Sequence, residues 1–432
     1  MRNPVGGALV IATVALFGRY SQNDRNHSDM AFTQKPGRAS IAFSLSWQSP
    51  VAAHCERVFV RKINFWRDLF PGDMFDEAVA LKPGESCARQ FEAGVLVLPF
   101  SAGNIVTCPR SRFGRLQNGN AVTPVAGRFY PQGLAWSALD CFSGNMTPFR
   151  VVSVSDKELL CDTNHPLARY PLRLDAACVD FLEMPEERGG SCTDIAELVT
   201  LDGPGMQIPG GAGDTDFFGD YPFRRRNEQN DSLFYREPRM VEHLDGTAIG
   251  NVRELYGRLL DDGAKVLDLM SSCSSHLPEP PARFDVTGLG LNREELASNR
   301  QLTRRVVHDL NRDLALPFAD GEFDAVICTV SIEYLVCPVE VLREAARVTR
   351  PGGKVVTVFS HRWFPGKEIQ PWPELHAFER LGLVLDCYRK AGGYGDLNTE
   401  TVRGYMRPDD DPHIRETILS DPVFAVWGSA GA

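Results

Sequence analysis

The residues of this chain that are best suited to chemistry lie close together in the C-terminal half. His361 is followed by Arg362, Trp363 and Lys367, and imidazole, guanidinium, indole and ammonium groups at such short spacing are typical of a substrate site. We take His361 as the candidate general base, because an imidazole exchanges protons near neutral pH. Arg362, Trp363 and Lys367 then form the predicted lip of the substrate site.

The stretch before these residues predicts how they are positioned. Residues 323–330 form a short, nearly unbroken apolar run, as in a strand that is buried on both faces. Pro338 suits the first position of a helix, apolar residues repeat at helical spacing over 342–349, and Pro351 ends the helix. Residues 354–359 supply a second buried strand. A strand, a crossover helix and a strand make a βαβ unit, which predicts a parallel sheet.

The string LPFADGEFDAVICTVSIEYL, followed by VLREAARVTRPGG, resembles the fourth and fifth strands of class I S-adenosylmethionine-dependent methyltransferases. The resemblance extends over residues 232–432 and implies a doubly wound, Rossmann-like α/β domain. The other elements that we expect are a helix at 238–260, strands at 265–269, 284–291 and 306–311, a helix at 375–381, a strand at 383–388 and a last, antiparallel strand at 423–427.

The same resemblance implies that S-adenosylmethionine is the cofactor and that it lies across the carboxyl ends of the first strands. The turn after Asp268 has serines and no glycine, although a positive φ costs serine about 1 kcal/mol or more. Gly290 stands where a carboxylate for the ribose hydroxyls is expected, and the amide of Asn292 could replace part of that contact. Asp309 matches the acidic residue that holds the adenine. The cofactor-binding candidates are Tyr235, Arg239, Asp268, Met270, Ser271, Ser272, Leu289, Gly290, Asn292, Asp309, Leu310 and Thr329, of which Tyr235 and Arg239 could form a lid.

Residues 38–183 have a different character, because short alternating runs are separated by Gly, Pro and Asn turns. This pattern predicts a β-rich domain. The predicted strands lie at 39–47, 57–63, 93–98, 149–154, 158–161 and 172–179.

Two segments of this β-rich half carry a second resemblance. Residues 75–86 are similar to the short helix and turn of FKBP-type prolyl isomerases, and residues 149–179, with NHPLA at their centre, are similar to the strand return of the SlyD-type subgroup. The resemblance implies a flap inserted at about 114–147 and an isomerase groove. Phe113 and Leu174 occupy two groove positions, with a hydroxyl and a flat aromatic wall lost, so we expect weak isomerase activity or peptide binding alone.

The remaining segments connect or precede these two halves. Glycine and proline clusters over 184–231 predict a docked linker. Residues 1–37 form an N-terminal extension whose first 20 residues resemble a secretory signal, although no cleavage site follows cleanly. We favour Met30 as the functional start and a cytoplasmic location, with a secreted or periplasmic protein as the alternative.

Composition restricts the partners. The chain has 432 residues and a formal net charge of −10, which gives no electrostatic reason to expect nucleic acid or an anionic membrane. The 11 cysteines include no C-x-x-C pair, so no metal site is predicted, and a reducing compartment is expected.

The sequence therefore predicts an α+β, FKBP-like, β-rich domain with a flap insertion, followed by an α/β, doubly wound methyltransferase domain. The leading function is methyl transfer from S-adenosylmethionine to a protein or peptide acceptor presented by the first domain, and a small-molecule acceptor stays possible. A non-catalytic, chaperone-like binding protein and a peptidyl-prolyl isomerase are the alternatives.

Overall fold

The computed structural model describes residues 37–114, 122–182, 190–210, 215–217, 223–279 and 283–431. The N-terminal extension, with Met30, and parts of the flap and the linker lie outside the described residues. Among the residues that are described, no helix is both long enough and apolar enough to cross a bilayer.

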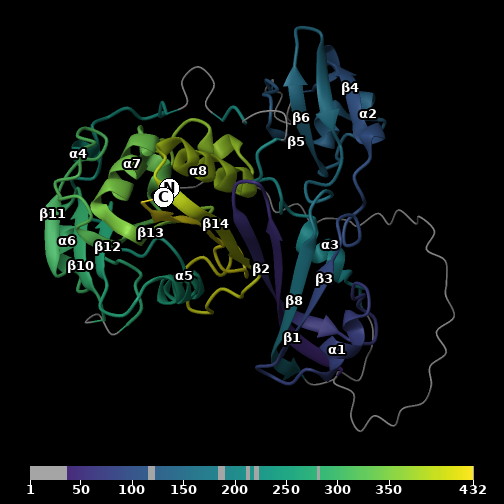
Figure 1. The fold of residues 1–432 in the computed structure, drawn as a ribbon, viewed down its shortest axis with the longest axis horizontal. Helices are drawn as coiled ribbons and strands as arrows, with labels where there is room; N and C mark the ends of the chain where they lie inside the picture. Colours follow the sequence, from purple (N-terminus) through teal and green to yellow (C-terminus); the bar gives the residue numbers. More distant parts are fainter. Residues whose placement is uncertain are drawn as a thin grey trace. The chain divides into compact units, whose positions relative to one another are not determined.

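The strands of the C-terminal half form one sheet in the order β11-β10-β9-β12-β13-β15-β14 (Figure 1). The first five run parallel, and β15 is antiparallel to both of its neighbours, as predicted for the last strand. The strand order reverses between β9 and β12, which places a crevice at the carboxyl ends of these strands. The bounds are β9 Lys265–Leu269, β10 Asp285–Gly290, β11 Arg304–Val307, β12 Phe323–Thr329, β13 Thr349–Phe359, β14 Tyr394–Arg403 and β15 Val423–Ala430.

Helices cover both faces of this sheet. One apolar cluster joins the sheet to α7 (Pro338–Val348) and α8 (Ala377–Ala391), and another joins it to α5 (Gly246–Leu259). Helix α5 begins after Asp245, whose side chain accepts hydrogen bonds from two backbone N–H groups, so the helix starts later than the predicted residue 238. A short helix, α6 (Arg293–Ser298), follows β10.

The prediction of a helix at 375–381 followed by a strand at 383–388 is wrong, because both segments belong to α8. Gly382 lies inside this helix and does not end it. Every residue from Phe378 to Tyr388 is buried. A helix that is buried on all sides lacks the polar stripe by which helical periodicity is recognised, so its apolar run imitates a strand.

The N-terminal half is β-rich, as predicted. Strands β1 (Arg38–Gln48), β2 (Ala53–Asn64), β8 (Leu172–Leu182) and β3 (Ser86–Phe91) pair antiparallel, and α1 (Met74–Ala80) contacts β3. The strand predicted at 93–98 is a turn.

A second, four-stranded sheet is inserted between β3 and β8. Its order is β4-β7-β6-β5, with β4 Ile105–Pro109, β5 Phe129–Pro131, β6 Pro148–Val154 and β7 Glu158–Asp162, and it carries α2 (Trp136–Leu139). The insertion is therefore wider than the predicted flap at 114–147. It takes in β4 on one side of that segment and β6 and β7 on the other, which complete the sheet and its apolar cluster.

The two halves share one sheet of eleven strands, because β14 pairs in parallel with β2. Residues 36–432 accordingly form one compact unit. Buried ion pairs add to this junction: Arg403 Nε lies 2.5 Å from Glu56 Oε1, and Arg128 Nε lies 2.9 Å from Glu379 Oε1. The expectation of two domains joined through a linker is thus corrected to two halves joined edge to edge.

The described part of the predicted linker contains two short helices, α3 (Ile195–Thr200) and α4 (Asp231–Phe234). Phe217, also from this segment, is buried in the cluster beneath α8. The remaining short elements are the 3-10 helices η1 Ala102–Asn104, η2 Arg110–Arg112, η3 Gln132–Ala135, η5 Ile332–Tyr334 and η6 Trp372–Glu374.

Candidate functional site

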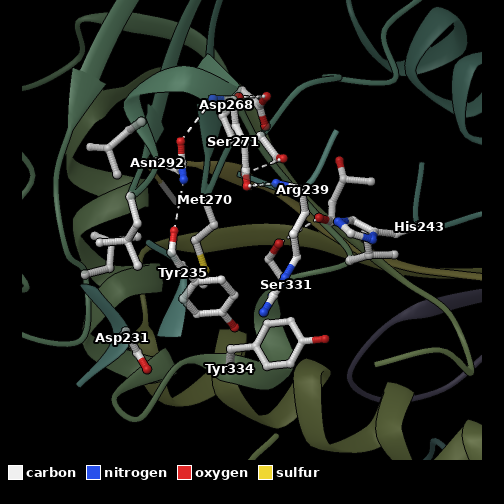
Figure 2. Close-up of a pocket in the computed structure, with 18 of the residues that line it drawn as sticks. Asp231, Tyr235, Arg239, His243, Asp268, Met270, Ser271, Asn292, Ser331 and Tyr334 are labelled. Carbon is white, nitrogen blue, oxygen red and sulfur yellow. Dashed lines mark hydrogen bonds between the residues drawn. The ribbon is translucent and has the colours of Figure 1, made fainter. Parts of the chain in front are cut away.

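A cleft opens at the carboxyl ends of β9, β10 and β12, with about 970 Å³ of empty space including its open mouth. All of the predicted cofactor-binding residues line it, and Figure 2 shows how they surround the space. They come from five segments: the chain around α4, the turn after β9, and the ends of β10, β11 and β12. The sheet thus assembles side chains that lie far apart in the sequence.

The glycine-free turn after β9 is held by hydrogen bonds to Asp268. The buried Asp268 carboxylate accepts a hydrogen bond from Ser271 Oγ at 2.6 Å and another from Ser275 Oγ at 2.7 Å. Burial raises the pKa of Asp268 to about 6, although both serine hydroxyls act in the opposite direction. The residues of this turn with positive φ are Met270, at 55°, and His276, at 54°. The serines therefore do not adopt the left-handed conformation that the sequence suggested for them.

Gly290 has a steric reason to lack a side chain. A Cβ atom built at this position would lie 2.1 Å from the carbonyl oxygen of Ser271. The two segments are this close because the Ser271 N–H donates to the Leu289 carbonyl at 2.8 Å. A ribose-binding carboxylate at position 290 is therefore incompatible with this turn.

Asn292 does not supply the missing contact, because its amide is used elsewhere. Its Oδ1 accepts from the N–H groups of Glu294 and Glu295 and caps α6. Its Nδ2 donates to the carbonyls of Tyr235 and Arg236, both at 3.0 Å. The predicted role of Asn292 as a substitute ribose ligand is thus corrected: it anchors the lid segment.

Glu295 holds the same segment at a second point. Its carboxylate accepts from the backbone N–H of Arg239 at 2.8 Å and from Ser272 Oγ at 2.7 Å. With Asn292, it fixes Tyr235 and Arg239 at the rim of the cleft (Figure 2). Their role as a lid stays a prediction.

The opposite end of the cleft is aromatic, and two of its buried polar atoms lack a hydrogen-bond partner among the described residues. The Arg239 guanidinium carbon lies 4.5 Å from the ring centre of Phe364 and 4.7 Å from that of Phe234. Arg239 Nη1 and Tyr235 Oη are buried, and neither has a hydrogen-bond partner among the described residues. Tyr334 also lines this end. A buried cationic donor without a partner favours an anionic ligand group at this position.

Lys367 is not a substrate-contacting residue. Its side chain is fully buried, and its Nζ lies 2.6 Å from Asp231 Oδ1. The other oxygen of Asp231 accepts from Arg225 at 2.8 Å and from Asn311 Nδ2 at 2.8 Å. Lys367 therefore anchors the start of α4, and its predicted place on the substrate lip is wrong.

The rest of the predicted substrate site also lies outside the cleft. His361 Nε2 is 3.5 Å from Asp421 Oδ1, and Arg362 is 3.3 Å from the other oxygen of the same carboxylate. Trp363 stacks under the Arg380 guanidinium, 4.6 Å from the ring centre. His361 thus cannot be the base for a ligand in this cleft. The chain turns away after β13, so that only Phe364 of this segment reaches the cleft.

At the far end of the cleft, Asp309 accepts a hydrogen bond from the backbone N–H of Asn311 at 3.0 Å. Its role toward an adenine stays a prediction. The sequence analysis missed several lining residues, namely His243, His276, His308, Ser331, Tyr334 and Phe364. Ser331 and Tyr334 follow the carboxyl end of β12, a position at which ligand contacts in parallel sheets are expected. His243 has no comparable signal.

The residues predicted for an isomerase groove do not meet. Phe113 belongs to the cluster of the inserted sheet, with its ring 5.2 Å from that of Tyr130. Leu174 is fully buried in the core of the N-terminal sheet. The two side chains therefore do not form a common groove. Among the described residues, no group of three or more His, Cys, Asp or Glu side chains could hold a metal ion.

Residues 271–357 match the family model described as a methyltransferase domain. The chain is 33% identical over 137 residues to a demethylmenaquinone methyltransferase of Renibacterium salmoninarum, which covers 31% of this chain and 54% of the relative. It is 30% identical over 162 residues to the ubiquinone/menaquinone biosynthesis C-methyltransferase UbiE of Laribacter hongkongensis, covering 34% of this chain and 63% of the relative. The chain thus spans little more than half the length of these relatives.

Among solved structures, the chain is similar to an S-adenosylmethionine-dependent methyltransferase of Thermotoga maritima, described as a possible histamine N-methyltransferase. The TM-score is 0.32 at 15% identity, over 42% of this chain and 89% of that one. The sequence matches support a methyltransferase domain in the C-terminal half.

Proposed function

We propose that the C-terminal half binds S-adenosylmethionine in this cleft and transfers its methyl group to a small acceptor. The observation that carries the proposal is the buried Nη1 of Arg239, which has no partner among the described residues and lies in a cleft of a methyltransferase-like sheet. A carboxylate such as that of the methionine part would satisfy this donor in a charge-assisted hydrogen bond.

The other roles follow from position in the cleft. Asp309, at the end of β11, would accept from the adenine amino group, and the glycine backbone at 290 would face the ribose without a carboxylate. The bound cofactor supplies a methyl group made electrophilic by the sulfonium. The protein positions the two reactants and excludes water, which supplies much of the catalysis in a direct transfer.

The acceptor that we propose is a small aromatic molecule. Tyr235, Tyr334 and Phe364 give one end of the cleft an aromatic lining. The relatives named above act, by their names, on demethylmenaquinone or in quinone biosynthesis. Both observations favour a flat, apolar ring with a reactive carbon or hydroxyl.

Presentation of a peptide acceptor by an FKBP-like N-terminal half is a second hypothesis. The inserted four-stranded sheet between β3 and β8 favours it, since the SlyD-type resemblance implies such an insertion. The separation of Phe113 from Leu174 weakens it, together with the isomerase activity that depends on the same groove.

Titration calorimetry of the full chain with S-adenosylmethionine and with its demethylated thioether product tests the proposal. We expect measurable but weak binding, because a missing charge-assisted contact costs about 1.5–3 kcal/mol. Asp309→Ala should abolish the signal. The matched control is Asp313→Ala, which removes an exposed carboxylate that bonds only the backbone of Ala315. No heat with either ligand at millimolar concentration, from a folded chain, would leave the non-catalytic binding protein as the better account.

A further inference from the structure

We infer that His243 is the general base that takes the proton from the acceptor. The inference rests on the proposed methyl transfer and assigns a residue to a step for which the sequence offered only His361. It depends on three properties of His243: its place in the cleft, its free ring nitrogens and its surroundings.

The place of His243 follows from the two ends of the cleft. Asp309 and Gly290 line the end over β11 and β10, where the adenosine part would lie, so the methyl group would point toward β12 and β13. Ser331 and Phe364 follow these two strands. The His243 ring lies at this end, 5.2 Å from the Phe364 ring and nearly perpendicular to it, at 84°. Figure 2 shows His243 and Ser331 on the same side of the cleft as Arg239.

The imidazole of His243 is also free to react. Neither of its nitrogens makes a hydrogen bond to any described residue, and the ring is half-buried, so that a nitrogen remains accessible from the cleft. A base must lie within hydrogen-bond reach of the proton that it removes. An acceptor bound beside the Phe364 ring would bring its acidic hydrogen to this imidazole.

The other imidazoles in the cleft are already engaged. His276 Nε2 lies 3.1 Å from Glu242 Oε2, and His308 Nε2 lies 2.8 Å from the carbonyl oxygen of Asp313. Each ring thus has one nitrogen engaged by the protein, and the other nitrogen of His276, Nδ1, is buried without a partner among the described residues.

The acidic groups of the cleft are no better placed as bases. The carboxylates of Asp231, Asp268 and Glu295 each hold two or more hydrogen bonds within the protein. Burial raises the pKa of Tyr235 and of Tyr334 above the ordinary value for tyrosine, so both phenols stay protonated.

The surroundings of His243 keep it neutral near pH 7. Burial lowers its pKa below the ordinary 6.5, and the neighbouring His276 and Arg239 act in the same direction. The carboxylates of Glu295 and Glu242 oppose them without reversing the shift. A neutral imidazole is the form that accepts a proton.

The acidic hydrogen of the acceptor passes to an imidazole nitrogen of His243, and the electron pair that is released forms the new bond to the methyl carbon. The bond from that carbon to sulfur breaks with its electron pair on sulfur, which turns the sulfonium into a neutral thioether. The proton then leaves the imidazolium for solvent, so no oxidant or further reactant is needed.

The first arm of the test is an NMR titration of the full chain carrying labelled histidine, with and without the thioether product. His243→Gln identifies the His243 signal by its loss. We expect His243 to titrate below the ordinary histidine pKa and to stay titratable with the product bound. A ring that is protonated at pH 7, or that stops titrating when the product binds, would overturn the inference, and this result requires no acceptor.

The second arm measures methyl transfer from a methyl-labelled donor to 1,4-naphthohydroquinone, kept reduced. His243→Gln should lower turnover by about 10²-fold or more, leave donor affinity unchanged and remove the acid limb of the pH–rate profile. Added imidazole should partly restore His243→Ala, which no structural role explains. His361→Gln, outside the cleft, is the matched control and should stay active. Turnover of His243→Gln equal to that of the native chain would refute the inference.

The two arms also separate the inference from the proposed function. Loss of donor binding in the native chain refutes the proposed function, and the inference falls with it. Donor binding without methylation of the hydroquinone removes the proposed acceptor class. In that case the titration of His243 alone decides whether a competent base stands in the cleft.

Discussion

The two ends of the cleft use their polar side chains in opposite ways. At the β9–β10 end, Asp268 and Asn292 are fully engaged in hydrogen bonds within the protein. Asp268 closes the serine turn, and Asn292 anchors the backbone of Tyr235 and Arg236. At the aromatic end, Arg239, Tyr235 and His243 keep donors or acceptors without a partner among the described residues. Because unpaired buried polar groups are costly, Arg239 Nη1 and Tyr235 Oη, together with His276 Nδ1 in the turn after β9, indicate where a ligand completes the structure.

The largest effect that we predict concerns Glu333, which lies between the cleft residues Ser331 and Tyr334. Its carboxyl group is fully buried, neither oxygen has a partner among the described residues, and burial raises its pKa from 4.5 to about 8. A raised pKa means that the folded state holds the proton. This contribution to stability is therefore present below about pH 4.5 and is lost as the pH rises through about 8, a loss of roughly 3–5 kcal/mol.

Urea unfolding of the native chain and of Glu333→Gln at acid and alkaline pH measures this effect. The amide cannot ionise, so the variant should keep its stability at about pH 9, where the native chain loses it. Glu237→Gln, which changes an exposed side chain, should follow the native chain. Equal pH dependence in all three proteins would show that Glu333 is solvated or paired in solution.

The second prediction concerns the unpaired cation at the aromatic end. Arg239→Ala should weaken the binding of S-adenosylmethionine by about 10- to 100-fold, because a hydrogen bond to a charged group is worth roughly 1.5–3 kcal/mol. Arg239→Lys should recover part of the affinity, since it restores the charge without the planar donor pair. Calorimetry gives both values. Arg236→Ala, an exposed neighbour, is the control, and an equal loss in that variant would mean that Arg239 acts only through general charge.

The sequence was sufficient to predict the elements that are defined by local patterns. The strands at 265–269 and 323–330, the helix that opens at Pro338 and the antiparallel strand at 423–427 are all present within a few residues. Each combines an apolar run of the right length with a proline, a glycine or a cap at its end. By contrast, the β2–β14 pairing joins residues that lie more than three hundred positions apart, and no local pattern encodes it.

The cofactor-binding candidates were found because they follow strand ends, and the sheet order brings strand ends together. The substrate-contacting residues were predicted wrongly, because they were chosen by their chemistry and not by their position at a strand end. His361 and Lys367 have suitable chemistry, but whether such a side chain faces a ligand depends on its partners, here Asp421 and Asp231. The same limit applies to Asn292: its proximity to Gly290 was evident, whereas its four hydrogen bonds could not be read from the sequence.

The third prediction tests whether the closed end of the cleft is as rigid as its hydrogen bonds suggest. Gly290→Ala should lower the free energy of unfolding by about 1–3 kcal/mol, because the added methyl group meets the backbone carbonyl of Ser271 at 2.1 Å and a backbone atom cannot rotate away. The matched control is Gly250→Ala in α5, where a Cβ meets nothing within 4 Å. That substitution should stabilise the chain by about 0.5–1 kcal/mol, since alanine is the better helix former.

If denaturant unfolding shows that Gly290→Ala lowers the free energy of unfolding and Gly250→Ala raises it, the close contact between the serine turn and β10 is supported. Because Glu295 holds both Ser272 of this turn and the backbone of Arg239, Gly290→Ala should also weaken the binding of S-adenosylmethionine. If Gly290→Ala is as stable as the native chain, the Ser271 carbonyl has room to move. The missing ribose carboxylate would then require an explanation other than steric exclusion.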